Sequence, residues 1–180
     1  MNDIIAITIG DIKGIGLKIL LDCWKEKRIK NFILFTDIKI LKKYIKNKNI
    51  LKKINFINLE NQKINFAQNK LNIYSFKSSS LEENTYKSLT NAYNFCLKKI
   101  CVGMITLPLR KDLIKEKIDK NFIGHTEFFQ KLNRKKYSNM ILFHKKIIIS
   151  PLTTHIRIKD IPKIISRNKF IFNQIFNLNI

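Results

Sequence analysis

Residues 124–127 hold the groups best suited to chemistry in this chain. Gly124, His125, Thr126 and Glu127 place an imidazole, a hydroxyl and backbone N–H groups at the predicted start of a helix. Helix starts attract anions because their first N–H groups lack partners within the helix and lie at the positive end of its dipole. The segment therefore predicts a cradle for a phosphate or for the polar end of a substrate. A histidine near a helix start that contacts no ligand is the alternative.

Two other segments carry groups of the same kind. Upstream, Thr106 and Lys111 follow a predicted strand, where a lysine can hold a phosphate or carboxylate as a point charge. A lysine that is only solvated is the alternative there. Downstream, Thr153, Thr154 and His155 follow an apolar stretch. A neutral imidazole can bind a metal ion or transfer a proton, but one histidine cannot hold a metal without partners.

A glycine-rich turn near the N-terminus is a further candidate. Gly10, Asp11, Gly14 and Gly16 lie between a predicted strand and a predicted helix. Glycines in that place let a backbone approach an anion closely. The spacing matches neither the dinucleotide fingerprint nor the phosphate loop of nucleotide hydrolases. A ligand-binding loop and a tight packing turn both remain open.

The candidate segments lie between strands and helices that alternate along the chain. Short apolar, β-branched runs predict strands at residues 4–9, 31–36, 71–76, 102–106, 140–143 and 146–150, with weaker signals at 54–59 and 64–66. Helical spacing and capping residues predict helices that begin near Gly14, Asp37, Ser80, Leu109, His125 and Ile158. This alternation predicts an α/β fold with a parallel sheet, in which residues 102–106 form a buried strand.

The charge of the chain is strongly positive. Lys+Arg 35 against Asp+Glu 13 gives a net charge of +22, which by itself suggests anionic partners. The lysines are spread along the chain between Ile, Asn and Phe residues, so a solvated basic surface is the simpler interpretation. Specific binding of nucleic acid is not expected.

Other features of composition bound the class of protein. A length of 180 residues with 45% hydrophobic residues allows one buried core. Neither a transmembrane segment nor a signal peptide is predicted, which favours the cytoplasm. Cys23, Cys96 and Cys101 form no C-x-x-C motif, so we expect free thiols rather than disulfides or a zinc site.

Taken together, the motifs resemble those of a known enzyme family. They occur in the order Gly10-Asp11-x-x-Gly14-Ile15-Gly16, Thr106-x-Pro108-x-x-Lys111, Gly124-His125-Thr126-Glu127-Phe128, Met140 and Thr153-Thr154-His155-Ile156-x-Ile158-x-Asp160-Ile161-Pro162. In this order and spacing the chain resembles the 4-hydroxythreonine-4-phosphate dehydrogenase family, from its first strand to about Pro162. Family members carry proline where Ile12 stands and proline-glutamate where Leu17 and Lys18 stand.

The resemblance implies a fold and an activity. The family has α/β/α sandwich domains of the isocitrate and isopropylmalate dehydrogenase-like type, so residues 1–107 would belong to the first domain and 108–180 would begin the second. Its members are homodimers that oxidise 4-phosphooxy-L-threonine, a small phosphorylated amino acid, with NAD (NADP is possible). The product then loses CO2 on the route to pyridoxal phosphate. A divalent metal (zinc, magnesium or cobalt) held by three histidines assists.

The resemblance also implies roles for particular residues. His125 and Thr126 would contact the substrate, His155 would be a metal ligand, and the loop with Gly10, Asp11, Gly14 and Gly16 could contact the cofactor. No catalytic residue is assigned. Family members are much longer, so we expect this chain to be an incomplete N-terminal half whose activity needs a homodimer or a complementing C-terminal half. The alternatives are a dehydrogenase for a related four-carbon sugar-acid phosphate and a non-catalytic remnant or basic binding module.

Overall fold

The chain divides into two compact units, Met1–His125 and Thr126–Ile180. The structure is a computed structural model that describes residues 3–60, 63–135, 138, 140–151, 153 and 156–163. The domain boundary that the family resemblance places after residue 107 stays a prediction.

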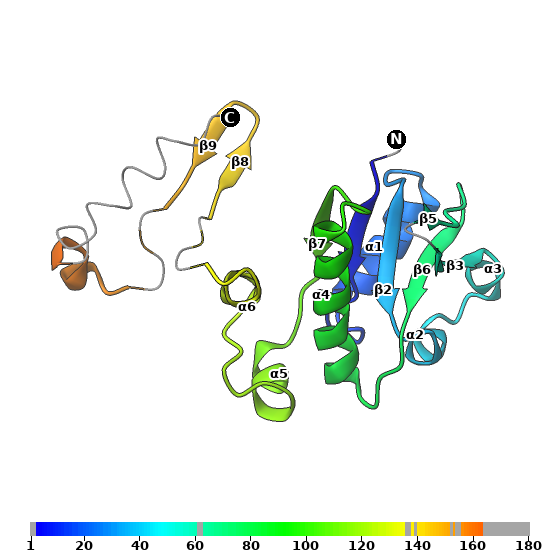
Figure 1. Cartoon of the computed structure of the whole chain (residues 1–180), viewed down its shortest axis with the longest axis horizontal. Helices are drawn as coiled ribbons and strands as arrows, with labels where there is room; N and C mark the ends of the chain where they lie inside the picture. Colours follow the sequence, from blue (N-terminus) through cyan, green and yellow to red (C-terminus); the bar gives the residue numbers. More distant parts are fainter. Residues whose placement is uncertain are drawn as a thin grey trace. The chain divides into compact units, whose positions relative to one another are not determined.

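The first unit is built on a parallel sheet of five strands in the order β3-β6-β2-β1-β7 (Figure 1). The strands are β1 (Ile5–Thr8), β2 (Phe32–Thr36), β3 (Ile54–Phe56), β6 (Leu71–Ser75) and β7 (Gly103–Thr106). Every pair of neighbours in this sheet is parallel, as the alternation of strands and helices predicts. The short strands β4 (Leu59–Glu60) and β5 (Lys63–Ile64) form a separate antiparallel pair.

Helices cover both faces of this sheet, which gives an α/β arrangement of three layers. The helices described in the first unit are α1 (Ile15–Lys25), α2 (Ile38–Tyr44), α3 (Lys48–Leu51), α4 (Leu81–Leu97) and α5 (Lys111–Lys117). Successive strand residues point to opposite faces. Ile7 packs in one core with residues of α1, α2 and α3, whereas Ala6 packs in the other with residues of α4. Figure 1 shows α1 and α4 on opposite sides of the sheet.

The strand β7 corrects one expectation from the sequence. Residues 102–106 are apolar enough to predict a buried strand, yet Val102 is 68% exposed and Ile105 is 47% exposed. The reason is topological, because among the described residues β7 is the edge strand of its sheet and pairs with β1 alone. An apolar pattern indicates a strand but does not say whether a second neighbour covers it.

Predicted helix caps are confirmed at two positions. The Asp37 carboxylate accepts a hydrogen bond from the Lys39 N–H (2.8 Å), and the Ser80 hydroxyl accepts one from the Glu83 N–H (3.0 Å). Burial raises the pKa of Asp37, but N–H groups of Ser78 and Lys39 that donate to its carboxylate lower it by more. The side chains of Asp37 and Ser80 thus fix where α2 and α4 begin, because each accepts a hydrogen bond from an N–H group of the first helical turn.

Asn84 joins α4 to the end of β2. It is fully buried, its Oδ1 accepts from the Asp37 N–H (2.7 Å), and its Nδ2 donates to the Thr36 hydroxyl (3.2 Å). We expect Asn84→Ala to lower the free energy of unfolding by about 2 kcal/mol, because it leaves buried polar groups without partners. Urea unfolding measures this. Asn94→Ala, at an exposed position of the same helix, is the control. Equal losses for the two variants would contradict the assignment.

The second unit contains a short helix and a hairpin. The helix α6 (His125–Leu132) begins at the last residue of the first unit, as the Gly124-His125 sequence predicts. The strands β8 (Leu142–His144) and β9 (Ile147–Ile149) pair antiparallel, so the predicted hairpin is confirmed with its turn one residue later than expected. A 3-10 turn, η1 (Ile158–Asp160), begins where a helix is predicted, and residues 164–180 lie outside the described residues.

Candidate active site

The ends of β1 and β7 bring two of the candidate segments together. Thr8 pairs in register with Thr106, so both strands stop at the same edge of the sheet. In open parallel sheets this carboxyl edge is where ligands collect. The loop with Gly10 follows β1, and the segment from Leu107 to Lys111 follows β7.

The glycine loop packs tightly against the segment after β7. Gly10 has a φ of +60°, and a Cβ at this position would lie 2.3 Å from the Pro108 carbonyl oxygen. At Gly16 a Cβ would lie 3.2 Å from side-chain atoms of Leu107 and Pro108. The space that these two glycines leave is therefore filled by the protein itself. This geometry supports the packing interpretation at Gly10 and Gly16, while a contact between the loop and a cofactor stays a prediction.

Asp11 closes the turn between these glycines. Its N–H donates to the Pro108 carbonyl (2.7 Å), its carbonyl accepts from the Gly14 N–H (2.9 Å), and its carboxylate accepts from the Lys13 N–H (3.0 Å). Gly14 is the N-cap residue of α1 and supplies no side-chain hydrogen bond. Asp11 thus holds the turn that starts α1 at the carboxyl edge.

A side chain from α4 fixes the same loop. The Thr85 hydroxyl is buried and donates to the Gly10 carbonyl at 2.7 Å, across 75 positions of sequence. The sequence prediction did not identify Thr85 as part of the site. A signal was available, since Thr85 falls in the helical stripe that also carries the buried Leu89 and Ala92, where an apolar residue is usual.

His125 is the candidate residue with the most informative surroundings. Its side chain is half-buried, and its Nε2 atom is buried with no hydrogen-bond partner among the described residues. Burial lowers the pKa of His125, and the charge of Lys111 lowers it further. The imidazole is therefore neutral at pH 7. A buried ring nitrogen without a partner costs free energy, which a ligand atom at that position would recover.

The structure thus brings Lys111 and His125 close enough to interact electrostatically, although they begin two different helices. Lys111 is the exposed first residue of α5. Thr126, half-buried, follows His125 in the first turn of α6. Thr154 and His155 lie outside the described residues, so the predicted metal ligand stays a prediction.

The described residues do not by themselves fit a metal ion or a nicotinamide cofactor. No group of three His, Cys, Asp or Glu side chains within them could hold a metal. The two glycines that might admit a cofactor phosphate are already in contact with Leu107 and Pro108. Cys101, another potential ligand, is buried, and burial with the neighbouring Cys96 raises its pKa to about 12.

The chain matches one family model over most of its length. Residues 28–175 match the family described as pyridoxal phosphate biosynthetic protein PdxA. The chain belongs to the PdxA family. Among curated relatives, the 4-hydroxythreonine-4-phosphate dehydrogenase of Sulfurihydrogenibium sp. is 32% identical over 175 residues, and that of Wigglesworthia glossinidia brevipalpis is 31% identical over 196 residues. These alignments cover 93% and 99% of this chain but only 54% and 59% of the relatives.

Solved structures of PdxA proteins share the fold. A 4-hydroxythreonine-4-phosphate dehydrogenase from Klebsiella pneumoniae superimposes with a TM-score of 0.74 at 19% identity, over 90% of this chain and 54% of that one. The corresponding protein from Burkholderia phymatum gives a TM-score of 0.68 at 20% identity. The chain therefore has the PdxA type of α/β fold and spans about half the length of the relatives that it matches.

Proposed function

We propose that this chain provides the substrate-binding N-terminal half of an NAD-dependent 4-hydroxythreonine-4-phosphate dehydrogenase. The observation that carries the proposal is the Nε2 atom of His125, which is buried, has no hydrogen-bond partner within the described part of the chain and feels the positive charge of Lys111. A neutral imidazole can donate one hydrogen bond to an anionic oxygen, and a lysine adds a point charge. Both groups suit the phosphate or carboxylate of 4-phosphooxy-L-threonine. NAD, a divalent metal and a cytoplasmic location belong to the same proposal.

Within this proposal each residue has a limited task. His125 and Lys111 bind and orient the anionic end of the substrate, and the Thr126 hydroxyl supplies a second polar contact from the same helical turn. His155 is the proposed metal ligand. A divalent metal held in part by His155 would supply Lewis-acid chemistry, and NAD would supply a hydride acceptor. Gly10, Asp11 and Gly16 support the edge of the sheet by packing on Leu107 and Pro108.

A second substrate of the same class is the alternative. A relative from Bradyrhizobium diazoefficiens, named for D-threonate 4-phosphate dehydrogenase activity, is 30% identical over 78 residues, which is 43% of this chain. By their names, the two substrates share a four-carbon chain with a phosphate at position 4. The shared phosphate would make the same contacts with His125 and Lys111, so these two residues do not discriminate between the substrates.

The test is NADH formation by two forms of the protein. One is the 180-residue chain, and the other is that chain fused to the segment that follows the matched region in the Sulfurihydrogenibium relative. We expect no turnover by the chain alone and turnover of 4-phosphooxy-L-threonine by the fusion, with D-threonate 4-phosphate assayed in parallel. A folded fusion that makes no NADH with either substrate would support a non-catalytic remnant. Turnover by the chain alone would show that the site is complete.

The β8–β9 hairpin supports a self-associating protein as part of this proposal. Leu142, Ile147 and Ile149 lie on one face of the hairpin and are 54%, 60% and 54% exposed. An isolated hairpin is barely stable in water, and a contiguous apolar surface of this kind marks contact with a partner. We therefore propose that a second copy of the chain covers it.

We expect Leu142→Asp to weaken self-association about tenfold or more, because it places a charge in an apolar interface. Sedimentation velocity over a concentration series measures the dissociation constant. Lys145→Asp, in the turn of the same hairpin, adds an acid without altering the apolar face. It should leave the dissociation constant within about twofold of that of the unchanged chain. A chain that is monomeric at all concentrations, or equal effects of both variants, would contradict the proposal.

A further inference from the structure

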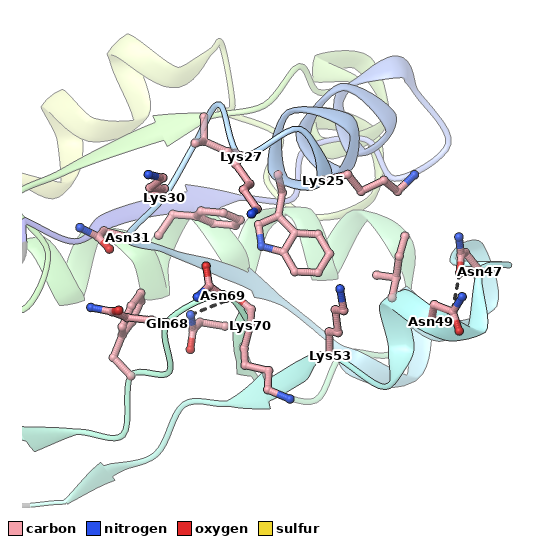
Figure 2. A pocket seen from close by; sticks show the side chains of 16 residues that line it. Lys25, Lys27, Lys30, Asn31, Asn47, Asn49, Lys53, Gln68, Asn69 and Lys70 are labelled. Atoms are coloured by element: carbon pink, nitrogen blue, oxygen red, sulfur yellow. Dashed lines mark hydrogen bonds between the residues drawn. The ribbon is translucent and has the colours of Figure 1, made fainter.

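A cavity of about 550 Å³ opens at the edge of the sheet where β2, β3 and β6 begin (Figure 2). Its walls come from the end of α1, from the loop before β2 and from the residues that precede β3 and β6. This edge is opposite to the one that carries Gly10 and Thr106. The volume lies within the range of small-molecule sites in proteins.

The cavity is lined by positive side chains without matching acids. Its five lysines are Lys25, Lys27, Lys30, Lys53 and Lys70, and none of its lining residues is Asp or Glu. Lys25 forms an ion pair with Asp22 (3.3 Å), whereas the other four have no acidic partner in the part of the chain that the structure describes. Several ammonium groups around one cavity repel one another, and an anion in the cavity would relieve that repulsion.

Only Lys25 lies in the last turn of α1, so the negative end of the helix dipole does not account for the other four lysines. The last carbonyls of α1 are already capped by backbone groups, since the Lys27 N–H donates to the Trp24 carbonyl (3.1 Å) and the Arg28 N–H to the Cys23 carbonyl (2.9 Å). In Figure 2 the Lys27 and Lys53 side chains extend into the same space from different loops, although Lys25 and Lys70 extend outward. Two cations from separate loops thus face one volume.

An aromatic surface lies beside these charges. Trp24 and Phe66 line the cavity and are half-buried, and Phe32, which also lines it, is buried. Amide side chains, among them Asn31 and Gln68, supply donors and acceptors around the rim. An indole beside lysines suits a ligand that is flat at one end and anionic at the other, because bases stack on aromatic rings with little dependence on sequence.

We propose that this cavity binds a small phosphorylated nucleoside, with the base against Trp24 and the phosphates between Lys27 and Lys53. The cavity is bounded by three loops and has the volume of a small-molecule site, which favours a mononucleotide over a nucleic-acid strand. The positive charge of the whole chain does not carry this inference, because that charge is distributed over the entire sequence. The proposal is independent of the dehydrogenase activity.

Trp24 provides the measurement, since it is the single tryptophan of the chain. ADP is titrated into the 180-residue protein at about 150 mM salt, where nonspecific attraction is screened, and indole fluorescence is recorded. We expect saturable quenching by ADP and binding about tenfold or more weaker for adenosine, which lacks phosphate, and for pyrophosphate, which lacks a base.

Two triple variants with equal loss of charge separate a site from a basic surface. The first is Lys27→Asn, Lys53→Gln and Lys70→Gln, where asparagine suits the left-handed backbone of residue 27 (φ 57°). It should weaken ADP binding about tenfold or more. The second triple variant is Lys18→Gln, Lys98→Gln and Lys120→Gln. It removes exposed lysines that do not line the cavity and should change the affinity for ADP by less than about twofold.

Three results would overturn the proposal. One is the same loss of affinity in both triple variants, with circular dichroism showing that both are folded. Another is binding of pyrophosphate as tight as that of ADP, which would mean that no aromatic contact exists. The third is an ADP titration of the unchanged chain that shows no saturable quenching of the Trp24 fluorescence.

Discussion

Replacing Gly10 by alanine is expected to lower the free energy of unfolding by about 3 kcal/mol. Two effects add. The residue has a φ of +60°, where an L side chain is strained, and the new Cβ would lie 2.3 Å from the Pro108 carbonyl oxygen. That oxygen accepts the Asp11 N–H at 2.7 Å, and the Gly10 carbonyl accepts the Thr85 hydroxyl. The loop therefore cannot move without breaking hydrogen bonds.

Gly103→Ala is the matched control for this experiment. Gly103 begins β7 and does not have a positive φ, and among the described residues a Cβ added there would meet nothing within 4 Å beyond its chain neighbours. We expect its free energy of unfolding to change by less than about 0.5 kcal/mol. Urea unfolding of both variants gives the comparison. A Gly10→Ala protein as stable as Gly103→Ala would show that the glycine loop is free to move, and would favour the ligand-loop interpretation.

Replacing His125 by alanine is expected to lower kcat/KM for 4-phosphooxy-L-threonine about 100-fold in the fusion protein. The lost group is a neutral imidazole whose Nε2 is buried and, among the described residues, without a partner, beside the charge of Lys111. A hydrogen bond between such a group and an anion contributes about 1.5–3 kcal/mol, which corresponds to roughly 10- to 150-fold. His125→Gln should recover part of the loss, since an amide can also donate.

The pH dependence follows from the direction of the pKa shift. The pKa of His125 is lowered, so its protonated form appears only below the ordinary histidine range. The ratio of wild-type to His125→Ala activity should therefore be constant between about pH 7 and pH 8. Asn94→Ala, at an exposed position of α4, is the control and should have activity within about twofold of wild type. Equal activities of His125→Ala and wild type would remove His125 from the substrate site.

Much of the fold follows from local patterns in the sequence. The apolar runs predict the strands of the parallel sheet, and Asp37 and Ser80 mark helix starts because their side chains accept from backbone N–H groups two and three residues later. The burial of β7 was predicted incorrectly, because burial depends on the neighbours of a strand and not on its own residues. The same limit applies to any edge strand with an apolar sequence.

The site is less predictable because its contacts join distant parts of the chain. The sequence leaves Gly10 as either a ligand contact or a packing residue, and the deciding neighbour, Pro108, comes from the loop after another strand. Thr85 contacts the same glycine from α4. The resemblance to the family indicates His125, but only the fold places it beside Lys111 with a buried nitrogen. The lysine cavity similarly requires the ends of three strands to meet.

The pKa of His125, measured by NMR on the imidazole of the fusion protein with and without 4-phosphooxy-L-threonine, tests the central claim most directly. Without substrate the pKa should lie below the ordinary histidine value of about 6.5, in the direction that burial and Lys111 dictate. Bound substrate should raise it, because a phosphate or carboxylate beside Nε2 stabilises the protonated ring. If saturating substrate leaves the pKa of His125 unaltered, the imidazole does not contact the anion and the proposed substrate site is wrong.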